Sequence, residues 1–260
     1  MFKFDFKLTS GDKNVGTVYL PNKNSRNIPV IIYCHGWNGN RYLSDYPTML
    51  PICERAMQEN IAIVAFDFFG FGETGGDHSK MTYTRWKENL AEIVSWVISQ
   101  PFSKDDKIGC FAVSSGTTAA LRLAAEDSRL AFIISVATCA TAHFNMHTGG
   151  PAKLLADNLV SLVADGTANI LNVDFGIDFF IDTISKAPIH TVKQIQCPVL
   201  FLQGTADNTF RCADAKMAYD LMVEHNPRAS YISVEGGNHG IDNMPEIAAE
   251  KAFEWLLGGL

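Results

Sequence analysis

Short apolar runs alternate with segments of helical periodicity along most of the chain. Uncharged apolar runs are typical of strands buried on both faces of a parallel sheet, and they occupy residues 30–34, 61–66, 108–113, 130–136 and 197–202. Helices are predicted between them at residues 46–59, 83–99, 117–125, 213–224 and 245–257, with a last strand at 229–234. This alternation predicts an α/β fold with a doubly wound, mostly parallel sheet.

The first twenty residues carry a different pattern. Charged and apolar side chains alternate over residues 3–8, and a Ser10-Gly11-Asp12 turn separates this segment from a second strand at residues 15–20. One-sided alternation predicts an antiparallel hairpin at an edge of the sheet.

The alternation of strands and helices breaks between residues 138 and 190. This segment has a helical pattern over residues 153–164 and a phenylalanine-rich stretch over residues 173–184, with no clear buried strand. We expect a helical lid insertion that folds over the carboxyl ends of the strands; the alternative is an extra helical layer that only adds stability. The expected organisation is an α/β core at 1–137 and 191–260, interrupted by the insertion at 138–190.

Composition and charge narrow the class of protein. The 260 residues are 47% hydrophobic, enough for a substantial core, and the net charge of −7 argues against a nucleic-acid partner. No apolar run approaches the roughly 18 residues of a membrane helix, and the N-terminus lacks the apolar centre of a signal peptide. The six cysteines contain no CxxC pair, so we expect reduced thiols in a cytoplasmic protein. The sequence leaves the oligomeric state open.

A strand-turn-helix segment at residues 107–120 carries the strongest chemical signal. The predicted strand at 108–113 runs into Ser114, and an alanine-rich helix follows directly. Ala112 and Gly116 flank the serine at two residues' distance, which relieves crowding where the backbone reverses sharply. The serine side chain then projects from the sheet edge at a helix N-terminus, where negative charge is favoured. Ser114 is therefore the candidate nucleophile.

Two later strand ends supply partners for this serine. A serine hydroxyl needs an adjacent base, and the base needs a group that fixes its tautomer. Asp207 follows the strand at 197–202, and His239 follows the strand at 229–234 in a glycine-flanked loop. Because the carboxyl ends of parallel strands share one sheet edge, we expect Ser114, Asp207 and His239 to converge as a catalytic triad. Taken alone, Asp207 is better explained as a cap of the next helix, and only the joint pattern with Ser114 and His239 favours catalysis.

The loop after the strand at 30–34 reads His35-Gly36-Trp37. A glycine here lets the following amides point beyond the sheet edge, which predicts an oxyanion hole formed by the N–H groups of Trp37 and Ser115. The alternative is a glycine-rich turn without chemical consequence. We interpret His35 as a hydrogen-bonded structural histidine that holds the loop.

A Gly70-x-Gly72-x-x-Gly75 pattern follows the strand at 61–66 and superficially matches a dinucleotide-binding fingerprint. No helix begins after Gly75, and no second strand ends in an acidic residue about 20 positions later. We assign the segment to a loop over the site, and we expect no metal ion and no organic cofactor.

Taken together, the chain resembles the serine hydrolases of the α/β-hydrolase superfamily over nearly its full length. The resemblance rests on five motifs: His35-Gly36-Trp37, Asp67-x-x-Gly70-x-Gly72, the turn around Ser114, Gly204-x-x-Asp207, and Gly237-x-His239-Gly240. Within the superfamily it is similar to lidded bacterial carboxylesterases, including feruloyl and cinnamoyl esterases, which place their insertion at the same point. Dienelactone hydrolases have cysteine at the nucleophile position, and epoxide hydrolases and haloalkane dehalogenases have aspartate there, so the serine disfavours these branches.

This resemblance implies hydrolysis of a small-molecule carboxylic ester through an acyl-enzyme intermediate. The apolar insertion and Trp37 favour a small to medium hydrophobic or aromatic acyl group. A thioesterase, a peptidase or an acyltransferase would use the same triad, and the sequence does not decide among them. A ligand-binding member of the fold without catalysis is a further alternative, although such proteins usually lose one triad residue.

Overall fold

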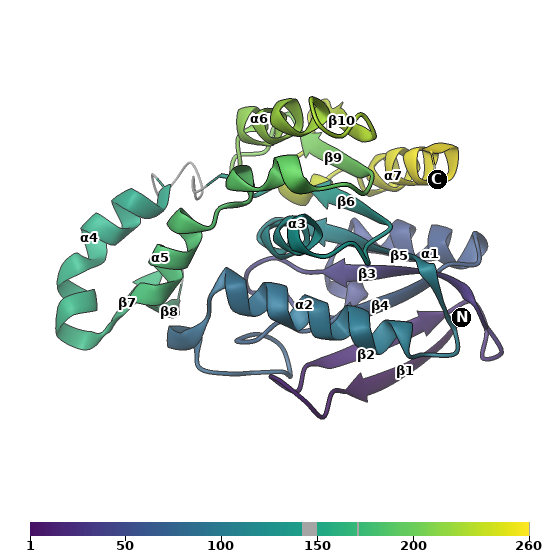
Figure 1. Cartoon of the computed structure of the whole chain (residues 1–260), viewed down its shortest axis with the longest axis horizontal. Helices are drawn as coiled ribbons and strands as arrows, with labels where there is room; N and C mark the ends of the chain where they lie inside the picture. The colour runs from purple at the N-terminus through teal and green to yellow at the C-terminus, as the bar shows by residue number, and fades with distance from the viewer. Residues whose placement is uncertain (142–149, 171, 260) are drawn as a thin grey trace.

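The central element is a mixed β-sheet with helices on both faces (Figure 1). The computed structural model describes residues 1–141, 150–170 and 172–259. Within these ranges eight strands form one sheet in the order β1-β2-β4-β3-β5-β6-β9-β10. Their bounds are β1 (Phe2–Lys7), β2 (Val15–Leu20), β3 (Ile28–Cys34), β4 (Ala62–Phe66), β5 (Ser103–Val113), β6 (Phe132–Val136), β9 (Val199–Gly204) and β10 (Ala229–Val234).

The direction of the strands agrees with the sequence pattern. β2 pairs antiparallel with both β1 and β4, so the N-terminal hairpin lies at one edge as predicted. All pairs from β4 to β10 are parallel. Their carboxyl ends therefore meet at one edge of the sheet, where the candidate catalytic residues lie.

Two apolar layers enclose the sheet. In β3, Ile32 and Cys34 face one layer, whereas Ile31 and Tyr33 face the other. The first layer is covered by α2 (Tyr83–Ile98), α3 (Gly116–Glu126) and α6 (Cys212–Val223), and the second by α1 (Met49–Gln58) and α7 (Pro245–Gly259). The doubly wound α/β prediction is confirmed.

The insertion lies beyond one end of the sheet, where it packs against the first residues of α2 (Figure 1). Its described part consists of α4 (Gly150–Asp165), β7 (Thr167–Ile170), β8 (Val173–Gly176) and α5 (Ile177–Ser185). Residues 142–149 of the predicted insertion lie outside the described residues. β7 and β8 form a small antiparallel hairpin that the sequence pattern did not predict. The hairpin forms because alternate side chains of two four-residue segments, Ala168, Ile170, Val173 and Phe175, are buried together.

The structure also bears on the state of the cysteines and on membrane spanning. All six cysteines are free thiols, and four of them are buried. None of the helices within the described ranges is both long enough and apolar enough to cross a membrane.

Candidate active site

The turn between β5 and α3 holds Ser114 in a strained backbone conformation. Its φ is +55°, a left-handed value that costs a residue other than glycine roughly 1–2 kcal/mol. The Ser114 amide donates to the Val136 carbonyl at 2.9 Å, which fixes the turn to the neighbouring strand β6. A Cβ on Gly116 would lie 2.4 Å from the Cys34 carbonyl oxygen, so only glycine allows α3 to start this close to β3. The small residue after the serine is therefore required by packing.

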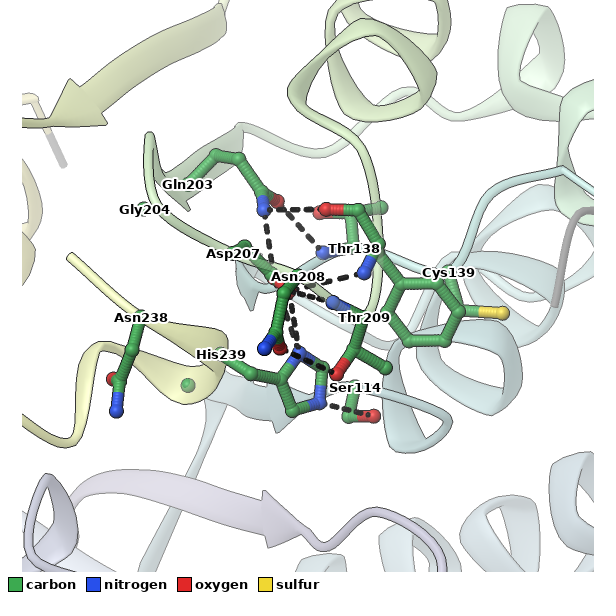
Figure 2. Close-up of polar contacts among 12 residues, drawn as sticks. Ser114, Thr138, Cys139, Gln203, Gly204, Asp207, Asn208, Thr209, Asn238 and His239 are labelled. Carbon is green, nitrogen blue, oxygen red and sulfur yellow. Dashed lines mark hydrogen bonds and ion pairs between the residues drawn. The ribbon is translucent and has the colours of Figure 1, made fainter. Parts of the chain in front are cut away.

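The structure brings Ser114, His239 and Asp207 together, as Figure 2 shows. The Nε2 atom of His239 lies 3.0 Å from the Oγ of Ser114, and its Nδ1 lies 3.0 and 3.1 Å from the two carboxylate oxygens of Asp207. Because an ionised carboxylate only accepts hydrogen bonds, the imidazole proton lies on Nδ1. Nε2 is then available to accept the proton of the serine hydroxyl.

Asp207 is buried and is held by several donors. Its Oδ1 accepts the amides of Thr209 at 2.8 Å and Phe210 at 3.0 Å. Burial by itself raises the pKa of this carboxyl, but the hydrogen bond and charge of His239 and the two amides outweigh burial and leave the pKa lowered. Asp207 therefore remains ionised beside the histidine.

Gln203 is a site residue that sequence reasoning did not identify. This fully buried side chain at the end of β9 donates from Nε2 to Asp207 Oδ2 at 2.9 Å, and its Oε1 accepts the Thr138 amide at 3.2 Å (Figure 2). Gln203 thus connects Asp207 to Thr138, the residue at which the predicted insertion begins. A polar residue at the end of an otherwise apolar strand was the available signal.

The loop that carries Trp37 lies beside Ser114. A Cβ built on Gly36 would be 3.0 Å from the Cβ of Ser114, so the loop passes close to the serine. His35 fixes this loop: its Nε2 accepts the Phe68 amide at 3.0 Å, and its Nδ1 donates to the Gly36 carbonyl at 2.7 Å. These two hydrogen bonds support the interpretation of His35 as a structural histidine. On the other side of the serine, Ser115 is the N-cap of α3, and the first amides of a helix have no acceptor within that helix.

Aromatic side chains of the insertion cover the indole of Trp37. Phe175 of β8 stacks on it with ring centroids 4.9 Å apart, and Phe179 of α5 lies at 5.6 Å. Tyr83, at the start of α2, packs on Phe179 at 5.6 Å and interacts with the side chains of Ser115 and Trp37. Burial raises the pKa of Tyr83 well above its ordinary value, so its hydroxyl stays protonated. We call Trp37, Tyr83, Phe175 and Phe179 the aromatic wall.

The glycine-rich segment after β4 is a loop held by a buried carboxylate. Asp67 accepts from the Arg41 amide at 2.6 Å, from the Arg41 guanidinium at 2.7 Å and from the Glu73 amide at 2.8 Å. A Cβ on Gly72 would lie 2.2 Å from the Asp67 carboxyl carbon, which explains the glycine by packing. In the part of the chain that the structure describes, no group of three or more His, Cys, Asp or Glu side chains is placed to hold a metal ion.

Sequence comparison identifies one matching family and distant relatives. A sequence model of the X-Pro dipeptidyl-peptidase (S15) family matches residues 10–168, which is more than half of the chain. A 31.7 kDa protein of Escherichia coli from the traX-finO intergenic region, itself uncharacterized, is 25% identical over 252 residues, covering 84% of this chain and 85% of that protein. The thiohydrolase aneE of Aspergillus aculeatus is 27% identical over 142 residues, covering 54% of this chain and 42% of that protein.

Solved structures share the fold over almost the whole chain. The structure of Est1E from Butyrivibrio proteoclasticus with bound ferulic acid superposes with a TM-score of 0.76 at 16% identity, covering 95% of each chain. This agreement over 95% of each chain shows that the two proteins have the same fold.

Proposed function

This chain belongs to the X-Pro dipeptidyl-peptidase (S15) family of α/β-hydrolases, and we propose that it is a serine hydrolase that cleaves carboxylic esters through an acyl-enzyme intermediate. The observation that carries this proposal is the hydrogen-bonded series Ser114–His239–Asp207, with 3.0 Å between the serine oxygen and the imidazole nitrogen. A hydroxyl becomes nucleophilic in this setting because the base is already aligned with its proton.

The reaction would proceed in two halves. His239 accepts the proton of Ser114 while the serine oxygen attacks the ester carbonyl, and the amides of Trp37 and Ser115 stabilise the oxyanion. Asp207 remains ionised and stabilises the imidazolium, which then protonates the leaving alcohol. A water molecule, deprotonated by His239, next attacks the acyl-enzyme and releases the acid and the free serine.

The aromatic wall supports a hydrophobic or aromatic acyl group. Trp37 carries both the amide that would bind the oxyanion and the half-buried indole on which Phe175 and Phe179 pack, so we infer that an acyl group attached at Ser114 lies next to this indole. Est1E, with ferulic acid bound in its own structure, shares the fold and is consistent with this assignment. We therefore infer that the acyl group of the substrate is small to medium in size and uncharged where it meets the aromatic wall.

The family match favours a second candidate function, the removal of an N-terminal dipeptide ending in proline. The same nucleophile, base and oxyanion hole would serve, since amide and ester cleavage share the acyl-enzyme route. The two candidates differ in the group that must be bound: a dipeptidase must neutralise a free α-ammonium group, whereas the four side chains of the aromatic wall carry no charge.

The experiment is a p-nitrophenyl ester series from acetate to decanoate, run beside Gly-Pro-p-nitroanilide. Ser114→Ala should lower ester turnover roughly 10⁵- to 10⁶-fold, and Ser95→Ala, at an exposed serine of α2, should leave turnover unchanged. A fluorophosphonate probe should label Ser114. Cleavage of the anilide without cleavage of any ester would replace the esterase proposal by the peptidase one. If the probe does not label the wild-type protein, Ser114 is not the nucleophile.

A further inference from the structure

A buried ion pair connects the insertion to the helix that follows the nucleophile. The guanidinium of Arg122 in α3 lies 3.0 Å from the carboxylate of Asp182 in α5. The two side chains are only 5% and 6% exposed, although Asp182 belongs to a segment at the periphery of the molecule. The same guanidinium donates to the hydroxyl of Thr84 at 2.6 Å, so three separate elements meet at this point.

The carboxylate of Asp182 is fully partnered. It accepts the Thr84 amide at 2.9 Å and the Thr84 hydroxyl as well as the guanidinium, and Lys186 approaches from solvent at 3.4 Å. Burial raises the pKa of this carboxyl, but the hydrogen bonds from Thr84 and Arg122 outweigh burial and leave the pKa lowered. Asp182 is therefore a charged group placed in the interior at a defined position, and removing its charge would leave the Arg122 guanidinium buried without this counter-charge.

Asp182 of the ion pair and Phe179 of the aromatic wall lie on one face of α5. Asp182 and Phe179 are three residues apart, which places them on the same side of a helix, while Ile177, Ile181 and Ile184 are exposed. Phe179 in turn packs on Phe175 with ring centroids 4.3 Å apart, and both rings contact Trp37. The orientation of α5 therefore places the ring of Phe179 directly and that of Phe175 through its contact with Phe179.

We propose that Asp182 is a positioning residue that, through Arg122, holds the phenylalanine rings of the insertion against Trp37 and thereby determines which acyl groups fit beside Ser114. This inference rests on the proposed hydrolase function. An ion pair is suited to positioning α5 because its geometry is satisfied at one rotation of the helix about its axis and one position along that axis. Packing of apolar side chains alone tolerates several arrangements. Burial of an ion pair is, by contrast, a weak means of stabilising a fold.

The test compares Asp182→Asn with Lys186→Met. The asparagine keeps the shape of the side chain but loses the charge, whereas Lys186 contacts the same carboxylate from a side chain that is 56% exposed. For the preferred ester, Asp182→Asn should raise KM about tenfold with kcat changed less than about threefold, and the dependence on acyl length should flatten. Lys186→Met should match wild type. An unchanged KM and an unchanged acyl profile in a folded Asp182→Asn protein would overturn the proposal.

A second variant covers the case in which Asp182→Asn does not fold. Arg122→Met combined with Asp182→Leu removes both charges and keeps the interior filled, a replacement that folded proteins tolerate. By far-UV circular dichroism this variant should be folded, yet its acyl profile should be flattened. A wild-type profile would show that apolar packing is sufficient and would overturn the role of the ion pair.

Labelling with fluorophosphonates of short and long alkyl chain separates this inference from the proposed ester substrate. The ratio of the two labelling rates at Ser114 should move toward one in Asp182→Asn, and this readout needs only the nucleophile. If wild type hydrolyses no ester but is labelled, the substrate proposal is wrong, and an unchanged ratio in the variant would overturn the role of Asp182 separately. If wild-type Ser114 is not labelled, both proposals are overturned.

Discussion

Gly36 lies so close to Ser114 that a methyl group on the glycine would be 3.0 Å from the Cβ and 3.4 Å from the Oγ of the serine. The loop after β3 and the turn after β5 are thus in contact at the Ser114 hydroxyl. The two strands are neighbours in the sheet, and Cys34 pairs with Ala112 just before the two loops begin. The distance between Ser114 and the loop that carries Trp37 is therefore fixed by strand register.

This contact predicts that Gly36→Ala lowers activity more than stability. The added methyl group must displace the serine or the loop by a few tenths of an ångström, and the alignment of Ser114 with His239 is sensitive to that shift. We expect kcat to fall on the order of 10²-fold, with the midpoint of urea unfolding nearly unchanged. Gly258→Ala, where nothing lies near the added carbon, is the control. Equal kcat values for the two variants would show that the loop does not constrain the serine.

The hydrogen bond between Asp207 and His239 predicts a large effect of Asp207→Asn. An asparagine amide donates to Nδ1, which moves the imidazole proton to Nε2 and leaves no acceptor for the serine hydroxyl. We expect kcat to fall about 10⁴-fold while the fold, measured by circular dichroism, is retained.

Asp214→Asn is the matched control for this change. Asp214 is also a buried aspartate, seven positions further on in α6, but its carboxylate pairs with Arg211 at 3.0 Å. Its amide variant should keep activity within a few-fold of wild type. A comparable loss in both variants would mean that charge in this region, and not the tautomer of His239, determines the rate.

The mostly parallel sheet with its antiparallel edge hairpin, and the meeting of Ser114, Asp207 and His239, were predictable from sequence because each follows from local signals. A buried parallel strand is recognisable as an apolar run, and a parallel sheet brings the carboxyl ends of its strands to one edge. Three polar residues that follow three such strands must then lie near one another, whatever the details of the connecting helices.

The parts that sequence reasoning missed depend on contacts between distant segments. In the sequence, Asp182 is one of several acids that give the insertion a mildly negative charge, and only the packed structure places it beside Arg122, 60 positions earlier. The β7–β8 hairpin was missed because its strands have four residues each, too few for a periodicity to be distinguished from a helical one. Gln203 was missed because its role depends on the Thr138 amide, which becomes its neighbour only when β6 and β9 pair.

The buried His35 predicts a pH dependence of stability that one substitution should remove. Burial lowers the pKa of His35 from 6.5 to about 4, so the folded protein keeps this imidazole neutral over a range in which the unfolded chain protonates it. Between those two values the unfolded state binds more protons, and the free energy of unfolding therefore falls as the pH falls. From pH 7.5 to pH 5 the contribution of His35 to this loss is about 2 kcal/mol.

In His35→Gln the loss of unfolding free energy between these two pH values should be smaller by about that amount, even though the variant is less stable at both. Urea unfolding at pH 7.5 and pH 5 measures the difference directly, and other titrating groups cancel when the variant is compared with wild type. His225→Gln, at an exposed histidine, should keep the wild-type dependence. If His35→Gln loses as much stability as wild type, the imidazole is protonated in the folded state, and its hydrogen bond from the Phe68 amide must break below neutral pH.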